Sequence, residues 1–555
     1  MNGLFNVVDG NLTYDGMHIS SGVPEIIQLY YRTGAPLSQP DALDLQIHFE
    51  GGFVLRKTIL LKDLCYQYLH KAEPMVSCPN ASAKNIFNEY LSELLREAIL
   101  SLPGMEKAGI YLANLGWNTL PDGSQIYVYG KRTIGECRQS ICTSPSLPNF
   151  ESIRQENALT ELVETLENSS PIVTQMSAYL ALATLRSPVL ESGCRLQAVA
   201  YLYGPRDSGK TTLAQSMAAF AKPVNSRNST NFFDASSTSA ALRDAMVTYR
   251  DLPLIVDDLC FSAGRQTEQK RVETAAQLIR QAANDTVITK KGPGGVNLEL
   301  SCDAAVILTA EFKLANESDL DRCIFFPILR KYKLDERIRP ELLRESTLDL
   351  AEWFVGNRDE ALNRLNRYIK HLIENNSDQT ISYRMLTNYG AMIWAFDCLM
   401  SAAKAEGVSK ERVEAIHNKL IKAINKAQTA QLEALNSIQK SRPVANLAYI
   451  LHEAYEEEMF RMAKKIDKLN NKDGIIWKGD FCLRKVPLEK FIRKQPGYQD
   501  YTATKIAREL NDIGALTVNE SDSFQVRLAA NTPRVYRIDP KVLKEHAKKY
   551  NASHS

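Results

Sequence analysis

One stretch of the sequence, 198–213, constrains the fold more than any other. An apolar run over 198–203 leads into Gly204-Pro205-Arg206-Asp207-Ser208-Gly209-Lys210-Thr211, which has the GxxxxGK[ST] spacing of a phosphate-binding loop. A helical segment over 212–220 follows the loop. Because the motif requires this order of strand, loop and helix, the sequence predicts a nucleotide-binding site in an α/β domain.

Each residue type in this loop has a chemical reason to be there. Gly204 and Gly209 permit a tight turn, so that successive backbone N–H groups point inward at the phosphates. The positive end of the following helix faces the same anions. Lys210 places a charge on the β- and γ-phosphates, and Thr211 offers its hydroxyl to Mg²⁺. The predicted ATP contacts are Gly204, Pro205, Arg206, Asp207, Ser208, Gly209, Lys210, Thr211 and Thr212.

A second motif, LPLIVDDL, occupies residues 252–259. A short apolar run that ends in acidic residues is how a Walker B strand brings carboxylates to the carboxyl edge of a parallel sheet. We therefore expect Asp257 to hold Mg²⁺ together with Thr211, and Asp258 to polarise the attacking water. Asp258 is one methylene shorter than the Glu that is usual at this position. The alternative role for Asp258, a solvated acid at the end of a strand, stays open.

The next two strands add two candidate catalytic residues. The apolar run over 304–308 ends in Thr309, which is placed to contact the γ-phosphate or the attacking water and is the predicted sensor. Arg322 directly precedes another apolar segment, 323–328. An arginine at a subunit edge can neutralise transition-state charge on the neighbour's γ-phosphate. The alternative for Arg322 is an ion pair with a nearby aspartate of its own chain.

Lysine residues stand beside a predicted hairpin just before the sensor strand. Two β-type runs flank Gly292-Pro293-Gly294-Gly295, which is strong turn composition, and Lys290 and Lys291 lie next to the turn. In a ring, such a hairpin would point its lysines into the central pore, where a DNA backbone attracts them. A solvated surface hairpin is the alternative.

The end of the chain has the pattern of a winged helix. We expect helices over 487–493 and 502–514, and wing strands over 523–529 and 534–538. Many winged helices bind protein instead of DNA, so the partner of this region stays open. The candidate phosphate contacts are Lys505, Arg508, Arg527 and Arg534.

The length of 555 residues is too great for one core, and about three to four domains are expected. We predict an α/β N-terminal domain (1–150), a P-loop ATPase domain with a mostly parallel sheet (151–335), a helical domain (336–471) and a winged-helix-like domain (472–555). The helical domain is predicted to include a helix over 443–469. In the N-terminal domain, Trp117 is more typical of a core aromatic than of a base-stacking residue.

Composition excludes several classes of protein. The apolar fraction of 44% and the charged fraction of 24% describe an ordinary globular chain, and the net charge of +2 says nothing about partners. The ten cysteines are scattered, without a metal-ligand cluster, which indicates reduced thiols. We see no signal peptide and no apolar run of about 20 residues, so we expect a cytoplasmic protein without a membrane partner.

The motifs together resemble those of AAA+-type P-loop ATPases that carry a hairpin before the sensor strand. YLYGPRDSGKTT, LIVDDL, GPGG and ILTAE occur in that order, and LDRCIFFPI is similar to the segment that carries the arginine finger. More narrowly, the chain resembles the helicase-like ATPases of bacterial mobile elements and prophages, a family long classed as a domain of unknown function. GWNTLPDGSQIYVYGKRTIG, SPIVTQMSAYLALATLRSPVL and RVYRI carry that likeness outside the core. Asp258 in place of Glu, and Glu311 after the sensor, depart from the pattern.

The motifs and the resemblance imply an ATP-hydrolysing DNA motor that uses Mg²⁺ and forms a homo-oligomeric, hexameric ring. Lys210, Asp257, Asp258, Thr309 and Arg322 would be the catalytic residues, with Arg322 supplied by the neighbouring subunit. Lys290, Lys291, Lys505 and Arg508 would contact DNA. An alternative is a nucleotide-gated switch or assembly scaffold, in phage defence or in loading a replication complex, whose winged helix binds protein. A DNA-binding regulator with a vestigial ATP site is disfavoured, because the site is complete.

Overall fold

The computed structural model divides the chain into two compact units, Met1–Leu432 and Glu433–Ser555. Helix α12 (Lys410–Lys440) crosses the boundary between them. None of the described helices is both long and apolar enough to cross a membrane. The structure describes residues 4–33, 35–36, 38–104, 107–144, 147–148, 150, 155–222, 228–259, 265–283, 287–291, 297–311, 314, 316–329, 336–376, 381–440, 446–495, 498, 501–517, 524–530 and 532–554.

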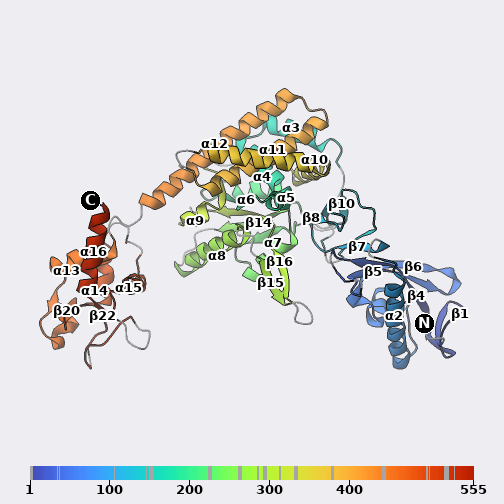
Figure 1. The fold of residues 1–555 in the computed structure, drawn as a ribbon, viewed down its shortest axis with the longest axis horizontal. Coiled ribbons are helices and arrows are strands. Elements are labelled where there is room, and N and C mark those ends of the chain that lie inside the picture. The colour runs from blue at the N-terminus through green and yellow to red at the C-terminus, as the bar shows by residue number, and fades with distance from the viewer. Residues whose placement is uncertain are drawn as a thin grey trace. The chain divides into compact units, whose positions relative to one another are not determined.

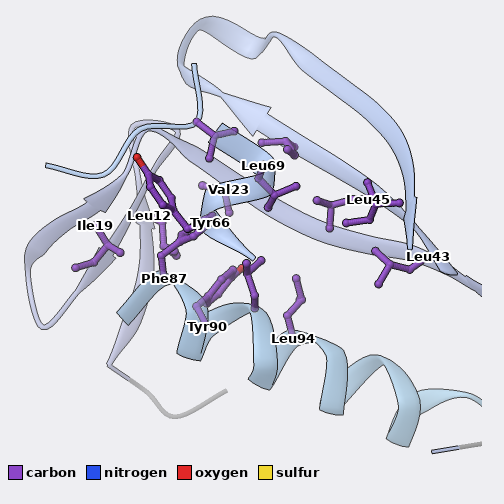
Figure 2. Close-up of a cluster of buried hydrophobic side chains, with 14 of the residues drawn as sticks. Leu12, Ile19, Val23, Leu43, Leu45, Tyr66, Leu69, Phe87, Tyr90 and Leu94 are labelled. Carbon is purple, nitrogen blue, oxygen red and sulfur yellow. The ribbon is translucent and has the colours of Figure 1, made fainter. Parts of the chain in front are cut away.

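The first unit begins with a three-stranded sheet of order β1-β2-β3, followed by a five-stranded mixed sheet of order β11-β7-β4-β5-β6. Alternate residues of β5, such as Leu43 and Leu45, point to one face, where they meet Phe87 and Leu94 of helix α2 (Figure 2). The elements are β1 (Phe5–Val8), β2 (Asn11–Tyr14), β3 (Met17–Ser20), β4 (Gly22–Tyr31), β5 (Ala42–Phe49), β6 (Val54–Leu60), α1 (Tyr66–Ala72), α2 (Ala81–Ser101), β7 (Gly109–Leu112) and β11 (Ile141–Thr143).

A small antiparallel sheet joins this region to the rest of the first unit. It consists of β8 (Gly116–Thr119), β9 (Gln125–Tyr129) and β10 (Arg132–Ile134). Trp117 on β8 is 1% exposed, and its Nε1 donates a hydrogen bond to the carbonyl oxygen of Thr184 at 2.7 Å. Trp117 is thus a core aromatic, as the sequence predicts, because the polar atom of its side chain is satisfied inside the protein.

The centre of the first unit is a parallel five-stranded sheet of order β13-β14-β17-β12-β18. Its middle strands are apolar throughout most of their length, since helices cover both faces. Helices α6 and α8 pack on this sheet from opposite sides (Figure 1). The elements are β12 (Val199–Tyr203), α6 (Lys210–Ala218), β13 (Phe232–Asp234), α7 (Ser239–Thr248), β14 (Pro253–Leu259), α8 (Arg265–Ala283), β15 (Val287–Lys291), β16 (Asn297–Ser301), β17 (Ala305–Ala310), α9 (Glu317–Leu320) and β18 (Cys323–Pro327).

Long helices pack over one side of this central sheet. Helix α11 contacts both α4 and the edge strand β18. Two polar side chains inside this layer fix it to the sheet: Tyr389 accepts from the Phe325 N–H, and Gln431 donates to the carbonyl oxygens of Leu320 and Cys323. The helices are α3 (Ala158–Asn168), α4 (Pro171–Thr184), α5 (Arg186–Glu191), α10 (Pro340–Glu374), α11 (Tyr383–Ala405) and α12.

The second unit contains a four-stranded sheet of order β19-β20-β21-β22 and its own apolar core. The predicted helix over 443–469 is wrong: helix α13 ends at Glu456, and a strand and a 3-10 helix follow. In the predicted wing, the described part of 523–529 makes only an isolated bridge, from Val526 to Val535. The elements are α13 (Leu447–Glu456), β19 (Met462–Ala463), η5 (Ile466–Asn471), β20 (Gly474–Trp477), β21 (Asp480–Arg484), α14 (Lys485–Ile492), α15 (Ala503–Asp512), β22 (Val535–Ile538) and α16 (Pro540–His554).

Candidate nucleotide site

The loop between β12 and α6 is shaped by two glycines. A Cβ on Gly204 would lie 2.1 Å from the carbonyl oxygen of Ile328, so only glycine lets the loop pass the end of β18. Gly209 has a φ of 94° and directly precedes the first residue of α6. The loop therefore turns sharply and presents the amino end of α6 toward the carboxyl edge of the sheet, which is the arrangement that favours an anion.

Lys210 lies inside the turn and not in solvent. The residue is 8% exposed, and its Nζ donates to the carbonyl oxygens of Gly204 at 3.0 Å and Pro205 at 2.8 Å. Burial lowers the pKa of this ammonium group, against the opposing effect of Glu311 and nearby aspartates. A phosphate beside Lys210 would favour the charged form, so the ammonium is held ready for an anionic ligand.

Asp257 and Asp258 stand at an irregularity in β14. The strand advances from Val256 to Leu259 while β17 advances only from Leu308 to Ala310, so β14 contains one extra residue. Asp258 has a φ of 68°, in the left-handed region. Such a bulge redirects side chains next to a site, and here it leaves Asp257 half-buried and Asp258 exposed.

The hydroxyl groups of two threonines meet the Asp257 carboxylate. Thr211 donates from Oγ1 to Asp257 Oδ1 at 2.8 Å, and Thr309 also donates to that oxygen. The Thr309 hydroxyl accepts a hydrogen bond in turn from the backbone N–H of Asp258 at 3.0 Å. One hydroxyl of β17 thus connects both acidic residues of β14 with the start of α6.

A cavity of about 460 Å³ opens at this edge of the sheet. Its walls come from the loop, from α6 and from the ends of β14 and β17, as expected where parallel strands end. Asp257, Gly204, Pro205 and Ser208 are predicted site residues that do not line it. The lining residues are Arg206, Asp207, Gly209, Lys210, Thr211, Thr212, Asp258, Leu259, Thr309, Ala310 and Glu311.

The side chains around the cavity fit a nucleotide that brings its own metal ion. No group of three His, Cys, Asp or Glu side chains that could hold a metal was found among the described residues. A divalent cation would therefore need phosphate oxygens beside Thr211 and Asp257, as Mg²⁺ commonly does. The hydroxyl of Ser208 is buried and has no hydrogen-bond partner within the described part of the chain, so the loop retains a polar atom for a ligand.

Arg322 is not at an exposed edge, contrary to the expectation from the sequence. It is 9% exposed, and its guanidinium donates to the backbone and side chain of Ser318 in the same chain. Burial lowers the pKa of Arg322, and Arg384 lowers it further. Asp319, one of the nearby aspartates, is bound by Arg280, with Nε–Oδ1 at 2.8 Å and Nη2–Oδ2 at 3.1 Å. A role for Arg322 as a finger stays a prediction.

A second cavity, of about 350 Å³, lies at the opposite edge of the central sheet. Gln197 and Asp321 in its wall precede β12 and β18, whereas the first cavity lies where strands end. The half-buried Arg384 and the exposed Arg195 also line it, and no ion pair of either is found among the described residues. Neither arginine was predicted from the sequence, since neither belongs to a recognisable motif.

The residues predicted to contact DNA lie in two separate elements, β15 and α15. Lys290 and Lys291 end β15, opposite Leu298 and Asn297 of β16. The turn residues 292–296 lie outside the described part of the chain. Lys505 and Arg508 are exposed on α15 in the second unit, so nothing brings them together with the hairpin within one unit.

Asp251, which was not predicted from the sequence, anchors the start of β14. Its carboxylate is fully buried and accepts from the Trp117 N–H at 2.9 Å and from the Ser187 N–H at 2.7 Å. Burial raises the pKa of Asp251 to about 6. No sequence pattern distinguishes such an acid from a solvated one, because its partners lie 64 and 134 positions away.

Comparison with known proteins gives a likeness of fold. No family profile and no curated protein matches the sequence. The solved SCCmec type IV Cch, described as an active helicase, is similar over 98% of this chain and 99% of that chain, with a TM-score of 0.56 and 13% identity. An apo C-terminal region of NrS-1 has a TM-score of 0.25 at 10% identity, covering 92% of this chain and 96% of that one. A JCV helicase structure has a TM-score of 0.18 at 10% identity, covering 50% of this chain and 69% of that one.

The two lower TM-scores carry no argument about this protein. The likeness to Cch spans both units, and at 13% identity it concerns the fold and not the chemistry. The fold of this chain is therefore helicase-like, a mixed α/β arrangement with a parallel-sheet domain and many helices.

Proposed function

We propose that the protein is a Mg²⁺-dependent ATPase that acts as a DNA motor. The observation that carries the proposal is that Lys210, Thr211 and Thr309 line one cavity at the end of the parallel sheet. Both threonine hydroxyls donate to Asp257, which does not itself line the cavity, and the amino end of α6 faces the same cavity. This set supplies the groups for phosphoryl transfer that come from the subunit that binds ATP, as distinct from those that a neighbouring subunit would supply.

The chain's residues have separate roles in this mechanism. Lys210 would leave the two carbonyl oxygens that it now contacts and bind the β- and γ-phosphates. Thr211 and Asp257 would hold Mg²⁺, which neutralises charge on the phosphates, and Thr309 would keep both acids in position. Asp258, the more exposed of the two, would orient the attacking water. Glu311 adds a third carboxylate to the wall and so favours a metal-bound nucleotide over a free anion.

The two arginines of the second cavity supply the group that the first cavity lacks. Five residues of β12 separate the two edges, about 16 Å at the usual rise per residue. A head-to-tail contact between copies would bring one chain's second cavity to the next chain's first, and such contacts close into rings. We place Arg384 or Arg195, rather than the internally bonded Arg322, next to the neighbour's γ-phosphate. The hairpin lysines Lys290 and Lys291 would line the pore of this ring.

DNA motor activity is the part of the proposal that rests on the helicase-like fold. A solved chain of similar fold is described as an active helicase, and the nucleotide site here has the groups that a motor requires. A nucleotide-gated switch would share the site but turn over slowly. The rate of ATP hydrolysis with and without DNA separates the two, since only a motor is strongly stimulated by its track.

Lys210→Ala is the decisive variant. Removal of the ammonium should abolish ATP hydrolysis, a loss of about 10³-fold or more, because the transferring phosphoryl group loses its main positive contact. Radioactive phosphate release from ATP measures the loss. Lys222→Ala, a change of a lysine in the same domain outside the cavity, is the control and should hydrolyse ATP at the normal rate. Equal hydrolysis by Lys210→Ala and the unmodified protein would refute an ATPase at this site.

A further inference from the structure

An excess of positive charge is concentrated in one part of the second unit. Residues 461–494 contain eleven Lys or Arg and four Asp or Glu, whereas the whole chain has a net charge of only +2. The remainder of the protein is therefore net negative. Charge of this density over a short segment is the usual sign of a surface that binds an anionic polymer.

Four of the lysines in this segment lie in the connection between β19 and β20, residues 464–473. Strand β19 is at the edge of the sheet and pairs in parallel with β20, so the connection runs along that edge by way of η5. Its four lysines are all exposed. They are Lys464, Lys465, Lys468 and Lys472.

Three of the four acids within 461–494 are engaged by arginines. Asp473 is bound by both ends of the Arg461 guanidinium, at 3.1 Å each. Asp480 pairs with Arg537, and Glu489 pairs with Arg493. No ammonium group of the four lysines has an ion pair or hydrogen bond to the described residues. Residues 464–473 thus contain four lysines and two acids, a net charge of +2, and one of these acids, Asp473, is already paired with Arg461 outside the connection.

The connection is held firmly on the sheet. Leu469 is 1% exposed and anchors η5 in the core. The Arg484 guanidinium donates to the carbonyl oxygens of Asn470 at 2.6 Å and Lys472 at 3.0 Å. The backbone N–H of Arg484 donates to the carbonyl oxygen of Asp473 at 2.9 Å. Because the backbone is fixed in this way, ligand binding would need to order only the lysine side chains.

Helix α15, the predicted DNA-contacting helix, has less unengaged positive charge than the β19–β20 connection. The Nζ of Lys505 lies 3.8 Å from the centre of the Tyr501 ring, so this ammonium group is already engaged. Arg508 stands beside Glu509, and Asp512 ends the helix, so α15 has no excess of positive charge. The excess of positive charge is therefore greater at the β19–β20 connection than on α15.

We propose that the β19–β20 connection is a docking surface for the phosphate backbone of duplex DNA. Lysine is depleted at the centres of protein–protein interfaces, which favour aromatic residues, and 461–473 contains no aromatic residue. Single-stranded DNA is usually held by aromatic stacking, which this connection cannot offer, so a duplex fits better. The inference rests on the proposed function only in taking DNA as the partner; it does not depend on hydrolysis.

The test compares full-length variants in their binding to a fluorescent duplex across a range of salt concentrations. The variant K464A/K465A/K468A/K472A should bind at least about tenfold more weakly at low salt. Its plot of log affinity against log salt should flatten by about 0.9 for each phosphate that the protein no longer neutralises, or about 2 to 4 in total. K505A/R508A should change the slope by less than about 1.

Two controls make the outcome specific. K370A/K404A/K422A/K426A removes four exposed lysines from the first unit, so it reports the effect of net charge alone and should keep the slope. An equal slope change in this variant, an unchanged slope in the connection variant, or a larger loss for a single strand than for the duplex would each overturn the proposal. So would a failure of the unmodified protein to bind duplex DNA.

The test also separates this inference from the proposed ATPase. Lys210→Ala should keep duplex binding while losing hydrolysis. If the unmodified protein hydrolyses no ATP but the connection variant still shows the flatter salt dependence, the motor is wrong and the docking surface stands. If hydrolysis is normal and the slope is unaffected, the docking surface is wrong and the ATPase stands.

Discussion

At the scale of single residues, Thr309 is the hydroxyl that joins the two acids of the site. It donates to Asp257 and accepts from the N–H of Asp258, so its removal would leave the N–H without its partner and the carboxylate less constrained. Thr309→Val keeps the shape of the side chain without the hydroxyl. We expect kcat for ATP to fall by about 10²-fold, with nucleotide affinity nearly unchanged.

Steady-state hydrolysis and equilibrium binding of a fluorescent ATP analogue measure the two quantities separately. Thr309→Ser restores a hydroxyl and should recover most of the rate, which distinguishes a positioning role from a loss of packing. A normal kcat for the valine variant would show that the hydroxyl has no part in hydrolysis.

At the scale of elements, the start of β14 is attached to the hairpin of β8 and β9. The hairpin's Trp117 N–H and Tyr127 hydroxyl both donate to Asp251, two residues before the strand begins. A Cβ on Gly116 would lie 2.4 Å from Asp251 Oδ2 and 2.7 Å from the carbonyl oxygen of Arg250. The strand that delivers Asp257 thus has its other end fixed by a distant part of the chain.

Gly116→Ala should therefore destabilise the first unit by about 3 kcal/mol, of which about 1 kcal/mol is left-handed backbone strain and the rest is steric overlap. Gly123→Ala is the matched control, because Gly123 has a similar positive φ of 83° but nothing within 4 Å of its Cβ. Thermal melting should show a shift several degrees larger for Gly116→Ala. Equal shifts in melting temperature for the two variants would mean that Asp251 moves away from the added Cβ without loss of stability.

The elements that the sequence predicts well are those set by local pattern. The spacing of Gly204, Gly209 and Lys210 and the apolar run before Asp257 place β12, α6 and β14, because phosphate binding needs those types in that order. The same pattern cannot show the bulge at Asp258, since an extra residue in a strand depends on its pairing with β17. It also cannot show that Arg322 bonds to Ser318.

The second unit was predicted least well, for a physical reason. Helix-favouring residues continue past Glu456, but the chain leaves the helix so that Phe460 can enter the core beside Phe481. Strand β19 is two residues long and carries no periodicity of its own. Tertiary packing thus overrides local propensity here, and the lysine-rich connection is recognised as a surface only once β19 and β20 are paired.

At the scale of the whole molecule, the two cavities of the first unit are complementary but lie at opposite edges of one sheet. Three carboxylates, those of Asp207, Asp258 and Glu311, line the nucleotide cavity together with Lys210. Among the described lining residues the other cation is Arg206, whose side chain is 85% exposed and so does not belong to the inner wall. The other cavity has two arginines without ion pairs among the described residues. A single chain cannot join them, so a head-to-tail assembly is the arrangement that uses both.

Arg384→Ala tests this assembly. The variant should bind ATP normally, because its Lys210 side is intact, but hydrolyse it about 10²-fold or more slowly, because the neighbour's γ-phosphate loses a positive contact. Mixed with Lys210→Ala subunits, it should regain activity at interfaces that pair an intact Lys210 with an intact Arg384. Arg412→Ala, which removes a half-buried arginine paired with Glu167, should leave hydrolysis unchanged. If mixed assemblies form without any recovery, the arginine acts within its own chain or not at all, and the interface must be built from other residues.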